Sequence, residues 1–287
     1  MDEIRFIEEQ AHSKNTREVA TKFPNVQTES ESSDFTIESA FQSTSEILLG
    51  KRLTNLQSYR EWLLEYVGES VRTKSEISGK TIYVPDIMFF SAIKRNMVTL
   101  EESLELAKKQ ISESDARSLT LSNASKKLEN VKFITSDVML GQNLDLRETS
   151  TCMNAQHCLD GYWYIYSKCD AYCAWPRETE YSFGSYFLFA SKFCIKCHNS
   201  VALTRCFEVS DSANCTDCYF CHNCEALSNC MFCFNVKSMR YAIGNIEIGR
   251  EKFMEIKTRL LGQVADELKK NKRLDLSIYN FGCWKIK

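Results

Sequence analysis

Turn-forming residues are scarce in this chain, which has only 10 glycines and 3 prolines among its 287 residues. Neither type occurs between Ser185 and Ile243. A segment of that length folded as ordinary β-hairpins would need several such residues in its turns. The absence therefore argues against hairpins here, and the chain must change direction in another way.

The chain also lacks an excess of positive charge and a long apolar run. Lys and Arg number 36 and Asp and Glu number 38, which gives a formal net charge of −2. Such a chain has no global positive charge to hold nucleic acid or an anionic membrane. Apolar stretches such as Val84 to Ile93 are far shorter than a membrane-spanning helix. We therefore expect protein partners or self-assembly, with no membrane and no nucleic-acid partner.

The first ten residues, MDEIRFIEEQ, are charged and lack the basic and apolar segments of a secretory signal. In a secreted chain the 14 cysteines would form a disulfide framework, but without a signal they are expected to stay reduced. The sequence thus predicts a cytoplasmic protein, or one inside a particle that assembles in the cytoplasm.

Composition and periodicity divide the chain into four regions. Residues 1–50 carry ten acidic and four basic side chains and few large apolar ones. This composition predicts an acidic mobile arm, because burial cannot offset the entropy lost on ordering. A small helical region is predicted for residues 51–116, a cysteine-rich β-solenoid for residues 117–247, and an amphipathic helix with a tail for residues 248–287.

Cysteine recurs in the third region with a period of three residues. Twelve of the 14 cysteines lie at positions that differ by multiples of three, and only Cys169 and Cys283 do not. The same class of positions extends back to Leu119 and includes Leu203 and Val209. A strand has period two and an α-helix has period 3.6, so neither fits. The class predicts inward, size-restricted positions at which cysteine acts as a small hydrophobic residue. Its cysteines are Cys152, Cys158, Cys173, Cys194, Cys197, Cys206, Cys215, Cys218, Cys221, Cys224, Cys230 and Cys233.

Asp and Asn recur at six-residue spacing, each immediately before an inward position: Asp211, Asp217, Asn223, Asn229 and Asn235. These residue types tolerate left-handed corners. The two spacings together predict a mainly β fold, a single-stranded β-solenoid or parallel β-helix whose short faces stack coil on coil. The handedness and the length of one coil stay open.

Near the C-terminus, Phe253, Ile256, Leu260 and Val264 follow one another at three to four residues. This spacing predicts an amphipathic helix. We expect the helix to cap an open coil end, because the uncovered edge of a solenoid invites aggregation.

The segment SANCTDCYFCHNCEALSNCMFCFNVKSMRYAIGN at residues 212–245 resembles the cysteine-rich repeat tails of uncharacterised proteins predicted in archaeal and viral genomes. The resemblance covers the chain from about residue 150 to about residue 247. It implies a β-solenoid shape and brings no assigned activity.

Zinc is the main alternative to packing as an explanation of the cysteines. Cys194, Cys197, Cys215 and Cys218 have the spacing of a four-cysteine structural site. An iron–sulfur cluster is a second thiolate-bound option. Neither explains why Leu and Val occupy the same class of positions, so we favour no bound metal and no cofactor.

An enzyme is the third hypothesis. Hexapeptide-like solenoids invite comparison with acyltransferases that use a histidine, and His198 and His222 lie within the periodic segment. Both fall in an outward class, which predicts surface histidines. No nucleotide-binding loop or trusted Ser/His/Asp order is present, so we expect no catalytic residues.

The sequence therefore favours a non-enzymatic binding or structural protein. Exposed aromatic rows on a solenoid are typical of an interface. We expect the scaffold to be a component of a larger assembly, such as a virion or similar particle. The outward aromatic residues are Phe183, Tyr186, Phe189, Phe207, Tyr219 and Phe234.

Overall fold

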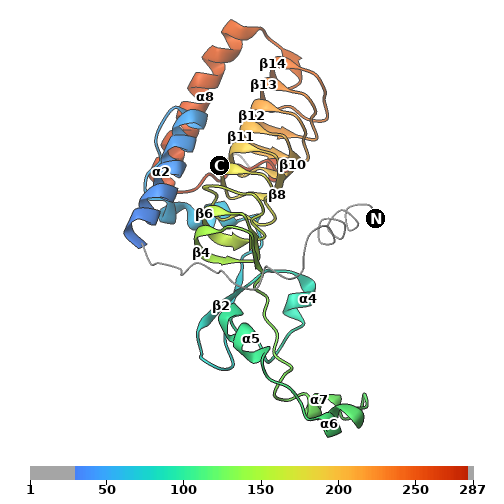
Figure 1. Cartoon of the computed structure of the whole chain (residues 1–287). Coiled ribbons are helices and arrows are strands. Elements are labelled where there is room, and N and C mark those ends of the chain that lie inside the picture. Colours follow the sequence, from blue (N-terminus) through green and yellow to red (C-terminus); the bar gives the residue numbers. More distant parts are fainter. Residues whose placement is uncertain (1–29, 284–287) are drawn as a thin grey trace. The chain divides into compact units, whose positions relative to one another are not determined.

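A computed structural model describes residues 30–283 of the chain (Figure 1). The features below lie in one compact unit that begins at Ser33, apart from the first three residues of helix α2. The helices are α2 (Ser30–Leu49), η1 (Leu56–Tyr59), α3 (Arg60–Leu64), α4 (Met88–Ser91), α5 (Leu100–Leu106), α6 (Glu113–Arg117), α7 (Ala124–Lys127), α8 (Arg250–Asn271) and η2 (Phe281–Cys283).

The strands confirm the predicted β-solenoid, because they pair in parallel with a constant offset. Cys194 pairs with Cys206, twelve residues later, and Thr204 pairs with Thr216. One coil therefore contains twelve residues. The solenoid strands are β3 (Met139–Leu140), β4 (Leu144–Ser150), β5 (Cys152–Met153), β6 (Gln156–Tyr162), β7 (Glu180–Phe183), β8 (Tyr186–Phe189), β9 (Lys192–Ile195), β10 (His198–Val201), β11 (Thr204–Ser210), β12 (Thr216–His222), β13 (Ser228–Met231), β14 (Arg240–Ile243) and β15 (Ile246–Glu247).

The chain turns at left-handed corners instead of hairpins. Every third residue from Asp145 to Tyr241 has a positive φ, and only Gly184 among these corners is a glycine. Four such corners close a coil of twelve residues. The predicted corners at Asp and Asn are confirmed, for example at Asp211 (φ 52°) and Asn223 (φ 51°).

The residue after each corner points into the solenoid. This is the periodic class that contains twelve cysteines, and its members form continuous buried clusters along the axis. Each coil bonds to the next through its backbone, as in the hydrogen bond from the N–H of Cys169 to the carbonyl of Gln156 (2.9 Å). The interior is therefore a stack of small side chains enclosed by parallel strands.

One outward row of the solenoid is apolar and lies beneath the helices. We call it the covered stripe: Ala171, Phe183, Ile195, Phe207, Tyr219 and Met231, one residue per coil and each at most 1% exposed. Helices α2 and α8 lie along this side of the strands (Figure 1). The ring of Phe41 in α2 is 5.2 Å from that of Phe183, and Lys257 in α8 lies over the ring of Tyr219.

The row of corner residues beside the covered stripe, which includes Asp160, Tyr172 and Gly184, contacts the short helices η1 and α3. Asp160 pairs with Arg60 at 2.8 Å, and the Tyr172 hydroxyl donates a hydrogen bond to Gln57 Oε1 at 3.0 Å. At Gly184 a Cβ would lie 2.7 Å from the carbonyl oxygen of Leu63. Glycine is needed here for close approach, since other corners with the same backbone carry larger residues.

The predicted acidic arm at residues 1–50 differs from the structure at its C-terminal end. Helix α2 buries Ile37, Phe41 and Leu48 against the solenoid and its covering helices. The acidic average of the whole segment concealed this apolar spacing. The rest of the predicted arm, residues 1–29, lies outside the described residues.

The structure differs from the predicted division in two other respects. The first solenoid strand begins at Met139 and not near residue 117, because α6 and α7 precede it and Leu119 is exposed. The predicted helical region 51–116 also contains an antiparallel hairpin of β1 (Val71–Lys74) and β2 (Thr81–Val84).

The C-terminal helix is present, but it lies along the side of the coils. The last coil is closed by β15, which pairs antiparallel with β14. Asn245 adds two hydrogen bonds to the backbone of Phe234, at 2.8 and 2.9 Å. A hairpin and a side chain therefore cover the edge for which a helix was expected.

Gly184→Ala tests the close approach of α3. We expect it to lower the free energy of unfolding by roughly 2–4 kcal/mol, since the added methyl group must displace Leu63. Gly244 is the matched control, because its φ of 58° is similar and nothing lies within 4 Å of an added Cβ. Gly244→Ala should cost about 1 kcal/mol. Equal losses in urea unfolding would contradict the packing argument.

Candidate functional site

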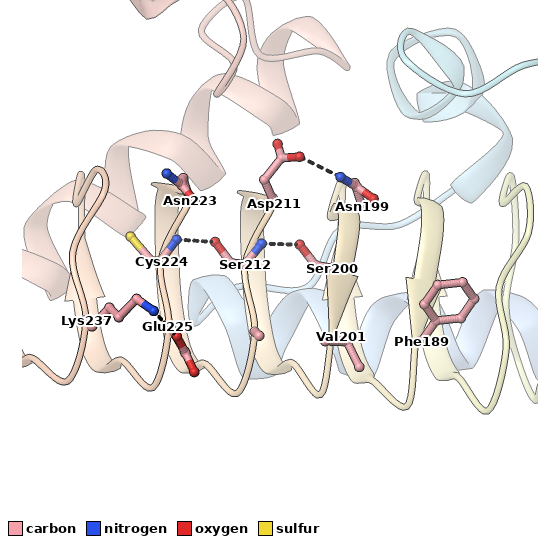
Figure 2. Close-up of a pocket in the computed structure, with 11 residues that line it drawn as sticks. Phe189, Asn199, Ser200, Val201, Asp211, Ser212, Asn223, Cys224, Glu225 and Lys237 are labelled. Atoms are coloured by element: carbon pink, nitrogen blue, oxygen red, sulfur yellow. Dashed lines mark hydrogen bonds and ion pairs between the residues drawn. The ribbon is translucent and has the colours of Figure 1, made fainter. Parts of the chain in front are cut away.

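A shallow groove runs across five coils on the side of the solenoid away from the covered stripe. Its volume is about 380 Å³. Figure 2 shows its lining residues in three parallel rows. The rows are Asn199, Asp211 and Asn223; Ser200, Ser212 and Cys224; and Phe189, Val201, Ala213, Glu225 and Lys237.

The first row is a ladder of polar corner residues. Asn199 Nδ2 donates a hydrogen bond to Asp211 Oδ1 at 2.6 Å, and Asn223 Nδ2 donates to Asn235 Oδ1 at 2.8 Å. These residues are twelve positions apart, so the coil length itself aligns them. The ladder gives one wall of the groove both amide donors and carbonyl or carboxylate acceptors.

The middle row fixes the coils to one another. Ser200 Oγ accepts a hydrogen bond from the Ser212 N–H, and Ser212 Oγ accepts one from the Cys224 N–H, both at 3.0 Å (Figure 2). Since these serines are buried, their hydroxyls support the groove and are not free for a ligand. The groove is therefore a rigid surface.

The third row is apolar at one end and charged at the other. Phe189, Val201 and Ala213 lie in successive coils, and Val201 is 42% exposed. Glu225 and Lys237 follow in the next two coils and form an ion pair at 2.6 Å. The groove thus offers an apolar strip beside a polar ladder.

Half-buried aromatic rings, tilted relative to one another, extend the polar ladder toward the N-terminal coils. Trp163, Trp175 and Phe187 precede Asn199 in the same corner row. The centroids of the two Trp rings are 3.6 Å apart, and those of Trp175 and Phe187 are 5.7 Å apart. The Phe187 ring also meets that of Phe189 at 4.8 Å. We call the groove and these rings together the uncovered face.

The predicted outward aromatic rows are divided by the structure. Phe183, Phe207 and Tyr219 are buried in the covered stripe, so the prediction that they are exposed was wrong. Period three identifies outward positions, but it does not show which of them a helix will cover. Tyr186 is 39% exposed and Phe189 lines the groove, as expected for an interface. Phe234 is half-buried, with its ring 5.8 Å from that of Phe281.

Sequence reasoning missed the groove itself. Asn199, Val201 and Glu225 have no shared signal at period three or six. The twelve-residue coil places these residues side by side, and their proximity cannot be predicted without that coil length. The usable signal was the series of Asp and Asn corner residues, in which Asp211, Asn223 and Asn235 recur at that interval.

The thirteen cysteines whose side chains the structure describes are all free and buried. In one coil the four inward residues are all cysteine: Cys215, Cys218, Cys221 and Cys224. Burial raises the pKa of Cys152 to about 12 and that of Cys197 well above its usual value. Protonated, enclosed thiols of this kind react slowly.

The alternative zinc set is not brought together as one ligand group. Cys194 and Cys218 lie in the same inward row with Cys206 between them, so they are two coils apart. With about 4.8 Å between neighbouring strands, their separation is roughly twice what sulfur ligands of one zinc allow. Cys197 and Cys215 lie in two other inward rows. Among residues 30–283, no three Cys, His, Asp or Glu side chains are arranged to hold a metal.

Conservative substitutions separate packing from ligation. If the thiols only fill space, Cys224→Ala and Cys230→Val should lower the free energy of unfolding by about 1–2 kcal/mol. Chelator should leave the melting temperature unchanged, and thiol labelling should be slow until denaturant is added. This account would be contradicted if the purified protein contained stoichiometric zinc and if chelator removed both the zinc and the cooperative folding.

Asp170 is the only fully buried acidic residue at an inward position among the described residues. Its Oδ2 accepts a hydrogen bond from Thr179 Oγ1 at 2.6 Å, and its Oδ1 accepts one from the Ser182 N–H at 2.8 Å. Burial nevertheless raises its pKa from 3.8 to about 7. The folded state thus holds a proton that the unfolded chain releases between these pH values.

Stability should therefore fall as the pH rises from about 4 to about 7, by on the order of a few kcal/mol from Asp170. The contribution is complete below the unfolded pKa and is lost as the pH passes the folded one. Asp170→Asn should flatten this dependence, measured as the free energy of unfolding in denaturant at several pH values. An unchanged slope in the variant would exclude Asp170 as its source.

The two histidines of the acyltransferase hypothesis lie in different environments. His198 is only 2% exposed and packs against the rings of Tyr66 and Tyr279, so the prediction of a surface histidine was wrong for it. Tyr66 follows helix α3 and Tyr279 belongs to the C-terminal tail, and together they cover the imidazole ring. Desolvation lowers the pKa of His198 to about 3. This imidazole is neutral and enclosed.

His222 is partly exposed and has both Ser210 and Asp211 as neighbours. Ser210 Oγ is 2.8 Å from Nδ1, and Asp211 Oδ2 is 3.3 Å from the same nitrogen. A Ser-His-Asp triad requires the hydroxyl and the carboxylate on opposite ring nitrogens. The contacts therefore describe a surface hydrogen-bond cluster and not a triad.

A scan against protein-family models found no match, and a search of curated proteins found no similar sequence. None of the helices between residues 30 and 283 combines the length and the apolar character needed to cross a membrane.

Proposed function

We propose that this chain is a non-enzymatic structural protein that joins a larger assembly through its uncovered face. The observation that carries the proposal is the contrast between two sides of one solenoid. Helices bury the covered stripe completely, whereas Val201 on the opposite side remains 42% exposed, and Tyr186, in the row of outward residues between the two sides, remains 39% exposed. Apolar and aromatic groups gathered on a rigid surface favour association with another protein.

The chemistry of the face supports a protein partner. The half-buried Trp163 and Trp175 rings supply aromatic area, and Asn199 and Asn223 supply adaptable hydrogen bonds. Asp211 and Glu225 add negative charge to the groove, with Lys237 as the one cation in its lining. This balance disfavours phosphate-rich partners.

The occupant that we propose is a second copy of this chain or another component of the same particle. The resemblance of residues 212–245 to repeat tails from archaeal and viral genomes supports a virion or similar particle that assembles in the cytoplasm. A rigid stack of coils suits such a role, since its surface changes little on binding.

Val201→Lys tests the role of the groove. A charge at its apolar strip should weaken association at least about tenfold, which corresponds to about 1.4 kcal/mol. Leu121→Lys is the control, because Leu121 is fully exposed in the segment before the solenoid. Native mass by light scattering across a concentration series measures the effect. Two results together would contradict the proposal. The wild-type protein would stay monomeric at all concentrations, and its native mass in mixtures with its particle components would equal that of both variants.

A further inference from the structure

Two charged residues are completely buried where the covering helices and the C-terminal tail meet the solenoid. Lys196 and Glu208 are successive members of one corner row, twelve residues apart, and both side chains are 0% exposed. Lys and Glu are rarely buried to this extent. Neither residue belongs to the groove or to the cysteine interior.

The ammonium group of Lys196 is held on several sides. Its Nζ donates to the carbonyl oxygen of Trp62 at 3.0 Å and to Glu65 Oε2 at 3.1 Å. The same nitrogen lies 4.5 Å from the centre of the Tyr66 ring. These contacts exclude water and fix the nitrogen in position.

Glu208 presents one oxygen to this ammonium group. Its Oε2 accepts a hydrogen bond from the Ile278 N–H at 2.9 Å. Its Oε1 lies 3.8 Å from Lys196 Nζ and has no hydrogen-bond partner among residues 30–283. Burial raises the pKa of Glu208 to about 7, so the carboxyl group is protonated in a large fraction of molecules at neutral pH.

Glu65 differs from Glu208 in both exposure and pairing. Its side chain is 33% exposed, and its Oε1 is 3.6 Å from the guanidinium group of Arg273. Two carboxyl groups thus flank one amine, one of them enclosed and the other open to solvent. Because of this asymmetry, the enclosed Glu208 is suited to be the electrophile and the solvent-accessible Glu65 is suited to carry protons.

We propose that Lys196 and Glu208 condense into an intramolecular amide bond that joins two adjacent coils. Glu65 takes a proton from the Nζ ammonium group, and the neutral amine attacks the carboxyl carbon of protonated Glu208. The new C–N bond forms as the C–O bond to the hydroxyl group breaks. Glu65 returns its proton to the leaving oxygen, the second Nζ proton passes to Glu65 and then to solvent, and one water molecule is released.

The arrangement supplies what such a condensation needs. No oxidant, reductant or activating group is required, because the carboxyl group is already neutral and water is excluded. Lys196 Nζ lies 3.8 Å from Oε1 of the carboxyl group whose carbon it attacks, and a side-chain movement must bring nitrogen and carbon to the roughly 3–3.5 Å at which reacting atoms meet. The product also removes a buried ammonium charge, which is costly to keep in a dry environment.

The intact mass of the purified chain tests the proposal directly. We expect the wild-type mass to be lower than the sequence mass by one water molecule. Peptide mapping should recover a branched peptide that contains Lys196 and Glu208. A folded protein that keeps the full sequence mass after incubation at neutral pH would overturn the proposal, and so would a branch between Lys196 and Glu65.

Exposed pairs in the same protein provide internal controls. Lys192 and Glu180 are also twelve residues apart and meet at 3.0 Å, but both are solvated. They should remain unlinked, so that only one water is lost. A branched peptide from this pair would show that proximity alone causes the reaction and would overturn the role assigned to burial.

Three substitutions test the assigned roles. Lys196→Arg should restore the full mass, and Glu208→Gln should lose ammonia in place of water. Glu65→Gln should slow the mass change at least about tenfold in refolded protein, since the proton carrier is absent. Circular dichroism identifies folded variants, and the wild-type mass decides the proposal even if a variant does not fold. An unchanged rate in folded Glu65→Gln would overturn the role of Glu65.

Discussion

The structure depends on one backbone constraint, a left-handed corner at every third residue from Asp145 to Tyr241. Each such corner costs a non-glycine residue roughly 1 kcal/mol or more, and the cost recurs along the whole stack. Parallel hydrogen bonds to the coils on both sides and burial of the inward residue offset it. Because the corner geometry allows limited interior space, most inward positions hold small or aliphatic side chains such as cysteine, serine and leucine, and Tyr164 is the enclosed aromatic exception.

Local spacing explains how much of this could be predicted from the sequence. A period of three residues and the corner residues Asp211 and Asn223 were sufficient for a β-solenoid with a buried cysteine class. The coil length was not accessible, because it depends on hydrogen bonds between residues that the local pattern does not relate. Phe183 and His198 were misjudged for the same reason. Their burial comes from α2, α3 and the C-terminal tail, which are distant in sequence.

Helix packing gives the solenoid two sides with different properties. The covered stripe has an apolar or aromatic residue in each coil, large in every coil after that of Ala171, and Phe41 and Lys257 are among the residues that contact it. The opposite side has no such restriction, and it combines Trp175, Val201 and the polar ladder. The zinc, iron–sulfur and acyltransferase hypotheses all assign a chemical role to the cysteines or the histidines. The coil geometry explains the observed positions of these residues without such a role.

Helix α8 also sets a length that the solenoid must match. Its 22 residues span about 33 Å, which corresponds to about seven coils at 4.8 Å each. Phe253 near its start meets Tyr241, and Asp266 near its end pairs with Lys51, just after α2. A duplicated coil along the helix would lengthen the stack without lengthening the helix. Repeat number in this architecture is therefore tied to helix length, at about three helical residues for every twelve-residue coil.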